Sequence, residues 1–444
     1  MTSLRRRDML IGAGAMLASP AILGRAQATD ADVVVIGAGA AGLAATRRLL
    51  RDGATVVTIE AADRIGGRCV TDTSIFGVPY DLGAHWLHSA AQNPFVDYGT
   101  DNGFDVYPAN EDEALYIGQR VASAADVADY DAALAATWRA IGAAAEAGRD
   151  VSVAEVAPDV GPWQDLVHLT IGPYSMAKDF DQFSCVDWYS GTGGQDYYCR
   201  EGFGALLAHS ARDVPVRLDT RADLVRWDGQ GVTVETDVGT ITARAIIVTV
   251  STGVLAAEGI RFDPALPDDM LEAIHGIPMG SYNRITLDFS EEPFGTDTDE
   301  YLAFQIPPSD GLSPHGMGIL TNVSGTALTY CDAGGRFGAD LFKEGRAAAI
   351  DYAVSELRQV FGPKIDRLFR TGHAITWDDN PLTLGSYASA DPGKAHLRAA
   401  LRQPVGDRIW LAGEACHRSQ WATVAGAHKS GQEVADAVTE ALRG

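Results

Sequence analysis

The feature that most constrains this chain is a glycine triplet that directly follows a short apolar run. Val33 to Ile36 reads as a buried strand, Gly37, Gly39 and Gly42 come next, and an Ala- and Leu-rich stretch with helical spacing follows. A strand, a G-x-G-x-x-G turn and a helix form the context of a dinucleotide-binding fingerprint. The glycines allow, in turn, a tight turn, the approach of a pyrophosphate and close packing of helix on strand. The sequence therefore predicts a nucleotide cofactor at the start of this helix.

A second apolar run ends in an acidic residue that suits the same cofactor. Ala54 to Ile59 reads as a strand, and Glu60 follows it, placed to accept hydrogen bonds from a ribose. The next loop, Arg64-Ile65-Gly66-Gly67-Arg68, resembles the second signature of the flavin-containing amine oxidase superfamily. In that family an arginine and the loop backbone approach the FAD, and an NAD-binding unit has no reason to carry such a loop. The resemblance implies that the cofactor is FAD.

The segment at residues 80–88 resembles the family's Gly-Ala-x-Trp motif, which borders the flavin ring. It reads Gly-Ala-His-Trp at 83–86, and Asn93-Pro94 follows. This version is closest to the polyamine oxidases, in which the corresponding histidine faces the amine. The resemblance implies that His85 contacts the substrate. The alternative is that this histidine is only a hydrogen-bonded part of the cavity wall.

Two segments near the C-terminal end resemble the family in the same way. Trp377 precedes the stretch Gly385-Ser386-Tyr387, and Gly413-Glu414-Ala415-Cys416-His417-Arg418 resembles the C-terminal FAD loop. Glu414 would bind the ribityl chain, and the backbone near Val424 would face the pyrimidine edge of the flavin. The motifs at both ends of the chain imply that the FAD domain is assembled from separated segments.

The substrate side shows half of the aromatic cage that monoamine oxidases carry. Tyr387 matches one of their two cage tyrosines, and Thr423 occupies the position of the other. In those enzymes the cysteine that bonds to the flavin immediately precedes the cage tyrosine. Ser386 stands at that position here, so the resemblance implies non-covalent FAD.

The resemblance implies a cofactor site drawn from the whole chain. The residues that it assigns to FAD are Gly37, Gly39, Ala41, Gly42, Glu60, Ala61, Arg64, Gly67, Arg68, Gly83, Ala84, His85, Trp86, Ala222, Trp377, Gly413, Glu414, Thr423 and Val424.

One position breaks the family pattern. Met279 to Phe289 alternates as a strand does, and it resembles the segment that carries a lysine linked through a water to flavin N5. This chain has Arg284 there. A desolvated lysine can lose its proton, whereas arginine keeps its charge and presents a rigid fork that suits a carboxylate. Two interpretations stay open: slow reaction of the reduced flavin with oxygen, or a substrate carboxylate held by Arg284.

The function implied by the resemblance is FAD-dependent oxidation of a polyamine or related amine. A hydride passes to flavin N5, the imine hydrolyses, and O2 (with release of H2O2) or another acceptor reoxidises the flavin. The residues assigned to this chemistry are Arg284, His85, Tyr387 and Thr423. The alternatives are an L-amino-acid oxidase that uses Arg284 for the carboxylate and a non-catalytic flavin-binding protein.

The predicted fold class is α/β, with a Rossmann-like (GR2-type) FAD domain built from discontinuous segments and an α+β substrate domain. After a signal peptide at 1–28, the expected segments are 29–91, 201–280 and 371–444 for the FAD domain, with 92–200 (helical) and 281–370 (sheet) for the substrate domain.

Residues 1–28 read as an export signal. Arg5-Arg6-Arg7-Asp8-Met9-Leu10 has a twin-arginine pattern, Ile11 to Leu23 is apolar, and Ala26-Gln27-Ala28 is a small-x-small cleavage site. The apolar part is shorter than the roughly 20 residues of a spanning helix. We therefore expect a periplasmic or secreted bacterial protein with no stable membrane anchor. An ordinary secretory signal or an anchor is the alternative.

Composition narrows the partners. The formal net charge of −24 attracts small cations such as amines and repels nucleic acid; O2 or a periplasmic acceptor would take the electrons, and the oligomeric state is not indicated. The cysteines show no metal-ligand spacing, so no metal site is expected. Export in the folded state favours buried thiols over a bridge between Cys185 and Cys199.

Overall fold

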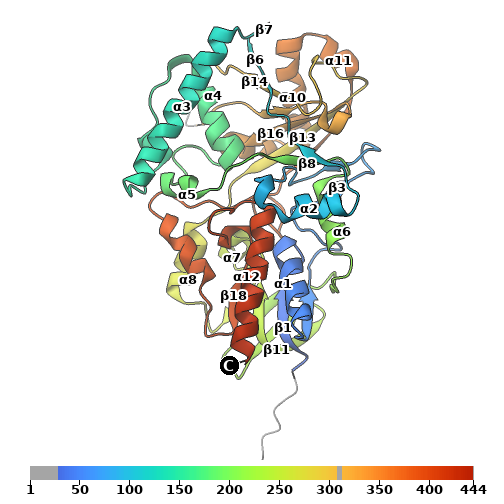
Figure 1. Ribbon diagram of the computed structural model, residues 1–444, viewed down its shortest axis with the longest axis vertical. Helices are drawn as coiled ribbons and strands as arrows, with labels where there is room; N and C mark the ends of the chain where they lie inside the picture. Colours follow the sequence, from blue (N-terminus) through green and yellow to red (C-terminus); the bar gives the residue numbers. More distant parts are fainter. Residues whose placement is uncertain (1–28, 308–312, 444) are drawn as a thin grey trace, which may run out of the picture.

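The computed structural model describes residues 29–307 and 313–443, and the predicted export signal lies outside the described residues. Two sheets form the centres of an upper and a lower part of an elongated molecule (Figure 1). The chain passes between the two parts several times, so each part is built from separated segments. This arrangement confirms the predicted α/β class with a discontinuous Rossmann-like unit.

The lower sheet has the strand order β12-β9-β10-β11-β1-β2, and β18 also pairs with β11. β1 (Ala31–Ile36) lies between β2 (Val56–Ile59) and β11 (Gly239–Val248) and is parallel to both. Its near-continuous apolar run is explained by burial on both faces, as is usual for parallel strands. The other strands are β9 (Ala222–Arg226), β10 (Val232–Thr236), β12 (Arg261–Asp263) and β18 (Ile409–Leu411).

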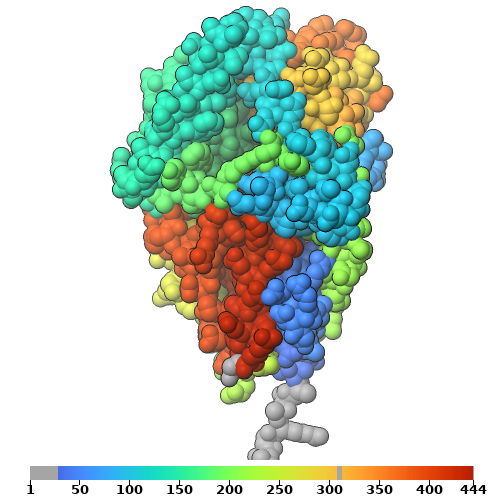
Figure 2. Space-filling model, in the orientation of Figure 1, coloured from blue at the N-terminus to red at the C-terminus, as the bar shows by residue number. Residues whose placement is uncertain are grey.

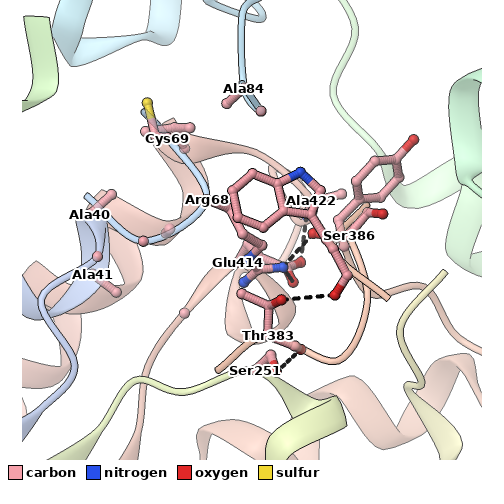
Figure 3. A pocket seen from close by; sticks show the side chains of 18 of the residues that line it. Ala40, Ala41, Arg68, Cys69, Ala84, Ser251, Thr383, Ser386, Glu414 and Ala422 are labelled. Carbon is pink, nitrogen blue, oxygen red and sulfur yellow. Dashed lines mark hydrogen bonds and ion pairs between the residues drawn. The ribbon is translucent and has the colours of Figure 1, made fainter. Parts of the chain in front are cut away.

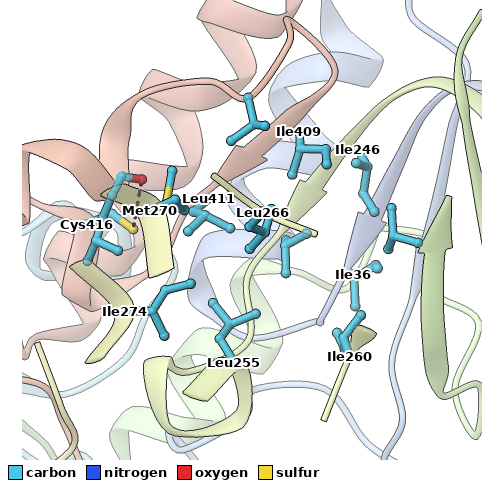
Figure 4. Packing of buried hydrophobic residues seen from close by; sticks show 14 of the residues in the cluster. Ile36, Ile246, Leu255, Ile260, Leu266, Met270, Ile274, Ile409, Leu411 and Cys416 are labelled. Atoms are coloured by element: carbon cyan, nitrogen blue, oxygen red, sulfur yellow. Dashed lines mark hydrogen bonds between the residues drawn. The ribbon is translucent and has the colours of Figure 1, made fainter. Parts of the chain in front are cut away.

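Helices cover both faces of this sheet. α1 (Ala40–Arg51) and α12 (Val424–Arg443) pack side by side on one face (Figure 1), around a cluster that includes Leu49 and Val438. On the other face, α7 (Thr252–Ala256) and α8 (Asp268–Gly276) enclose the second cluster. Figure 4 shows side chains of that cluster: Ile36, Ile246, Leu255, Ile260, Leu266, Met270, Ile274, Ile409, Leu411 and Cys416.

The upper sheet has the order β17-β13-β16-β15-β14-β6-β7. β13 (Tyr282–Phe289) lies between β16 (Leu328–Gly334) and β17 (Phe369–Ile375), antiparallel to both. α10 (Arg346–Phe361) packs against it through Ala349, Ala353 and Leu357. The remaining strands are β6 (Glu113–Ile117), β7 (Arg120–Val121), β14 (Tyr301–Phe304) and β15 (Gly318–Leu320). The helices α9 (Gly335–Lys343) and α11 (Lys364–Leu368) belong to the same part.

The segment 92–200 differs from the helical description predicted for it. Its long helix α3 (Ala124–Glu146) is present and starts at a capping box of Ser123 and Asp126. However, the segment also contains β6 and β7, and β6 pairs in parallel with β14, more than 180 residues further on. Short strands of this kind depend on distant partners, so local sequence did not reveal them. The upper sheet also extends to Ile375 in β17, past the predicted boundary at 370.

Two further helices pack beside α1. α2 (Pro94–Asp101) packs on α6 (Phe203–Ser210) through Phe95 and Phe203, so residues after 92 still belong to the lower part. The smaller elements are β3 (Thr71–Asp72), β4 (Tyr80–Asp81), β5 (Val106–Pro108), α4 (Gln164–Leu169), α5 (Cys185–Ser190) and β8 (Tyr197–Cys199).

All five cysteines lie within the described residues, and each is a buried free thiol. Within 29–307 and 313–443, no helix combines the length and apolar character needed to cross a membrane. The same residues contain no group of three His, Cys, Asp or Glu side chains that could hold a metal ion.

Candidate active site

A cavity of about 920 Å³ extends between the lower and upper parts and is lined by residues of both. All of the residues that the sequence assigned to the cofactor line it except Gly42, and so do Arg284 and Tyr387. Gly42 lies behind the cavity, where a Cβ atom would come within 1.9 Å of the carbonyl oxygen of Gly37. Its role is therefore packing of helix on strand, as predicted for the third glycine of the fingerprint.

The turn between β1 and α1 has the shape of a phosphate cradle. Gly37 has φ +103°, a left-handed backbone conformation that favours glycine. A Cβ atom on Gly39 would meet nothing within 4 Å, and no side chain caps the start of α1 there. Open space thus adjoins uncapped N–H groups at a helix N-terminus, which is where a pyrophosphate binds. The residues present fit the FAD that the sequence predicted.

Glu60 lies at the end of β2 and is anchored to the backbone on both sides. Its Oε2 accepts from the Ala38 N–H at 2.7 Å, and its Oε1 accepts from the Ala62 N–H at 2.9 Å. A carboxylate has about four acceptor sites, so each oxygen keeps one for a ribose hydroxyl. Ala222 lines the same end of the cavity, at the start of β9. Contacts of both residues with the adenosine half of FAD remain predictions.

Arg68 and Glu414 join three distant segments at the floor of the cavity (Figure 3). One guanidinium nitrogen, Nη1, donates to Glu414 Oε1 at 3.1 Å and to the Ser386 carbonyl at 2.5 Å. Glu414 Oε2 also accepts from the N–H of Ala422 at 3.1 Å. Glu414 therefore ties the loop before α12 to the Ser386 segment, a role that sequence reasoning missed. Its predicted contact with the ribityl chain is not tested by these bonds.

Arg284 is buried in the cavity wall with its charge neutralised. Its Nε and Nη2 donate to the two oxygens of Asp332 at 2.9 and 3.0 Å, and Nη1 donates to the carbonyls of Asp81 and Gly83. Burial alone would favour the neutral base, but Asp332 outweighs it and raises the pKa of Arg284. The guanidinium also lies 4.1 Å above the ring of Tyr330. Arg284 is a fixed, permanently charged part of the wall.

Rings line the substrate side of the cavity. The Tyr387 and Tyr282 centroids lie 5.8 Å apart, and Tyr174 follows at 6.0 Å from Tyr282. Sequence reasoning did not assign Tyr282 or Tyr174 to the site. Tyr282 stands two positions before Arg284 on β13, and residues two apart on a strand point to the same side. That spacing was a usable signal, whereas Tyr174 lies in a segment without a motif.

Thr423 does not complete a cage with Tyr387. Its hydroxyl donates to the Gln420 carbonyl at 2.7 Å and accepts from the Gly426 N–H at 2.9 Å. These are the bonds of a helix N-cap, so Thr423 fixes the start of α12. It lines the cavity but offers no ring there.

His85 is held firmly by its neighbours. Nδ1 lies 2.8 Å from Asp81 Oδ2, and the ring stacks on Tyr198 with centroids 4.8 Å apart. Nε2 is buried and has no partner among the described residues. With 2% of the residue exposed, the ring is covered by its neighbours, and substrate contact by His85 remains a prediction.

The family's position for a covalent link to flavin carries a serine in this chain. Ser386 occupies the family's cysteine position, and its hydroxyl donates to the Tyr282 carbonyl at 2.9 Å. Cys69 also lines the cavity, but burial raises the pKa of this thiol well above its usual range, and a protonated thiol is a poor nucleophile.

These features define a class of protein: an oxidoreductase in which a dinucleotide cradle opens into a chamber walled by aromatic rings. The model of the flavin containing amine oxidoreductase family matches residues 40–155 and 169–439, and the chain belongs to this family. The protein is therefore an FAD-dependent amine oxidoreductase, as the sequence predicted. Non-covalent attachment of the FAD stays a prediction. The two alternatives, an L-amino-acid oxidase and a non-catalytic flavin-binding protein, are not favoured by this match.

The relatives agree with this assignment, and solved structures share the fold. Polyamine oxidase 4 of Oryza sativa subsp. japonica is 28% identical over 452 residues, covering 92% of this chain and 88% of its own length. Polyamine oxidase 2 of Arabidopsis thaliana is 29% identical, covering 93% and 89%. Cyclohexylamine oxidase from Brevibacterium oxydans IH-35A superimposes with a TM-score of 0.74 at 23% identity, covering 94% and 100%. Putrescine oxidase bound to putrescine gives 0.75 at 21%, covering 91% and 98%. The two structural matches show a shared fold.

Removal of the Glu60 carboxylate tests the adenosine end of the site. Glu60→Ala is expected to weaken FAD binding by about 1.5–3 kcal/mol, because charge-assisted hydrogen bonds to the ribose would be lost. This corresponds to roughly one to two decades in Kd, measured by fluorescence titration of apoprotein with FAD. Glu235→Ala, at an exposed ion pair with Arg226 on the same sheet, is the control. If the Glu60 variant holds FAD as tightly as the parent, Glu60 does not bind the ribose.

Proposed function

We propose that the substrate is an aliphatic amine, a polyamine or a related secondary amine. The observation that carries this proposal is the row of tyrosine rings on the substrate side, Tyr387, Tyr282 and Tyr174. Aromatic faces attract cationic nitrogen and also pack against methylene groups. The similar proteins include polyamine oxidases and a putrescine oxidase, which supports the same substrate class.

The chain's own part in the reaction is to bind, orient and desolvate the amine. When bound, the flavin supplies the redox chemistry by accepting a hydride from the carbon next to the nitrogen. The rings of the wall exclude water, and desolvation favours the neutral amine, which is the form that can be oxidised. Burial raises the pKa of Tyr387, so this phenol stays neutral, and its hydroxyl donates to the Ser175 carbonyl at 3.4 Å. No general base is assigned.

An amino-acid substrate would need a cation free to grip its carboxylate. Arg284 has five N–H donors, and four of them are used by Asp332 and by the carbonyls of Asp81 and Gly83. One remaining N–H cannot form the parallel pair of bonds by which arginine recognises carboxylates. This geometry supports an amine over an amino acid.

The electron acceptor is the second part of the proposal. The family's lysine can release a proton when desolvated, whereas Arg284 keeps its charge in the ion pair with Asp332. We propose that the replacement of the family's lysine by Arg284 slows the reaction of the reduced flavin with O2. Another electron acceptor then competes with oxygen for the electrons.

The site of action completes the proposal. The twin-arginine pattern at Arg5-Arg6-Arg7 and the small-x-small site at Ala26-Gln27-Ala28 support export of a folded protein to the periplasm or beyond. A route that carries folded proteins suits an enzyme that takes up FAD before export.

An anaerobic substrate panel tests the function. We expect polyamines and simple aliphatic amines to bleach the flavin absorbance, while L-amino acids leave it unchanged because no free arginine fork receives their carboxylate. Dithionite reduction of the same sample serves as the positive control. Bleaching by amino acids alone would identify the protein as an L-amino-acid oxidase. Bleaching by neither group of compounds would exclude amine oxidation.

Arg284→Lys separates the two half-reactions. The variant is expected to speed reoxidation by O2 without much change in reduction by amine, because a lysine can position a water and lose a proton. Stopped-flow absorbance gives both rates. A variant at an exposed arginine pair, Arg358→Lys beside Asp366, is the control. If the rate of flavin reduction by amine falls instead, by the equivalent of about 1–3 kcal/mol, Arg284 contacts the substrate. If neither rate changes, Arg284 influences neither half-reaction.

Joint substitution of Arg6 and Arg7 by lysine tests the export route. The pattern requires both arginines, so the variant should accumulate inside a bacterial host while the parent reaches the periplasm, as judged by fractionation and blotting. Arg5→Lys, outside the paired positions, is the control. Equal export of parent and paired variant would exclude the twin-arginine route.

A further inference from the structure

We infer that α3 is a docking surface for a second copy of this chain, and that two molecules pair through it in antiparallel orientation about a two-fold axis at Ala135. The inference concerns the outer surface of the upper part (Figure 1). It therefore does not depend on the proposed substrate or electron acceptor.

Exposed apolar side chains are concentrated at α3. Ten large hydrophobic side chains are exposed among the described residues, and four of them lie on this helix or beside it: Val121 (64% exposed), Val127 (38%), Trp138 (46%) and Tyr189 (48%). In Figure 2 the teal surface over α3 forms the outer edge of the upper part, and no other segment covers it on the face shown. Apolar side chains gathered in this way are typical of a surface that contacts another molecule.

The inner face of α3 is used by the core, and a second row of residues faces outward. Tyr130, Leu134 and Ile141 are buried against the cluster that includes Leu166 and Val167 of α4. The outer row, in which Ala135 is half-buried and the others are exposed, has alternating spacings of four and three residues: Ala124, Ala128, Asp131, Ala135 and Trp138. This is the heptad spacing by which two helices pack side by side. The small alanine side chains allow the two helix axes to lie close together.

Tyr189 of α5 extends the outer row by one turn. Position 142 is the next in the spacing, and a Cβ atom on Gly142 would lie 3.3 Å from the Tyr189 ring. The Tyr189 hydroxyl donates to Glu146 Oε1 at 2.6 Å, which holds the ring over the helix. The outer row therefore ends in a fixed aromatic ring.

Charge complementarity favours a second copy as the occupant of this surface. Asp131 and Arg139 are exposed, and among the described residues neither forms a side-chain hydrogen bond or an ion pair. They stand at equal distances before and after Ala135 in the helix. A two-fold axis at Ala135 thus sets Asp131 of each copy level with Arg139 of the other, within reach of the long arginine side chain. A parallel pair would instead set each charge beside an identical one.

The apolar side chains match about the same axis. Positions 128 and 142 pair, so Val127 and Ala128 of one copy meet the Tyr189 ring of the other, and Trp138 meets Ala132. Buried tryptophan and tyrosine side chains often contribute most of the binding free energy at an interface. A single helix about 35 Å long gives a modest contact area, so we expect a reversible dimer at micromolar concentrations.

Charge reversal tests the pairing. Sedimentation velocity of the flavin-loaded protein over about 1–100 µM should show a monomer–dimer equilibrium. Asp131→Arg and Arg139→Asp should each raise the dimer dissociation constant by about tenfold or more, because each sets like charges together twice. The double variant restores opposite charges and should return the constant to within about threefold of the parent. Asp340→Arg, at an exposed pair with Lys343 on α9, is the control and should leave the constant unchanged.

A cysteine on the axis gives a second, geometric test. All five native cysteines are buried and react slowly for that reason. Ala135→Cys adds a thiol that a short bis-maleimide should link to its counterpart in the second copy. Ala143→Cys, at an exposed position of the same helix, is the control. Its two copies would lie about 24 Å apart along the paired helices, so this variant should stay unlinked.

Each outcome decides the inference. A monomer at every concentration would overturn it, whether α3 then faces solvent or a different protein. A dimer that no α3 variant weakens, or a double variant that stays as weak as the single ones, would overturn the antiparallel pairing. None of the substituted residues lines the cavity. Flavin content and anaerobic reduction by amine should therefore match the parent in every variant, which separates loss of the dimer from misfolding.

Discussion

The contact between α1 and α12 is the constraint on which the whole site depends. A Cβ atom on Gly431 would lie 2.1 Å from the carbonyl oxygen of Ala41, so the two helices touch backbone to backbone. α12 in turn orients the loop before it, because the Ser430 hydroxyl accepts from the Gly413 N–H at 3.1 Å. The cradle made by the first helix and the loop made by the last are therefore set at a fixed separation. Any side chain at position 431 would move one away from the other.

A second constraint concerns charge. The proposed amine substrate is cationic in solution, and an unpaired guanidinium in the cavity wall would repel it. Asp332 removes this repulsion, because it faces Arg284 directly across the β13–β16 ladder and accepts two hydrogen bonds from it. Both groups are almost fully buried, and an ion pair of this kind is costly to break because either partner alone would be an uncompensated charge. The cavity wall thus combines aromatic rings with an ion pair, Arg284 and Asp332, that carries no net charge.

The parts of the site that the sequence predicted are those set by local backbone geometry. The glycine fingerprint and Glu60 were found because each role depends on a turn or a strand end within a few residues. Asp332 could not be found in this way, since it meets Arg284 only through strand register. Tyr174 comes from the segment 92–200, where the strands are short and their positions depend on distant partners. For that reason the cofactor half was more predictable than the substrate half.

The residues that line the cavity extend from Ile36 to Ala427 in sequence. This wide spread has a consequence for the folding of the chain during synthesis. Folding during synthesis proceeds from the N-terminal side, yet the cradle formed early stays without its opposite wall until the last helix has left the ribosome. FAD capture is therefore expected only after α12 has been made and has packed against α1. A molecule that has acquired its flavin has, by the same argument, already brought its first and last described helices together.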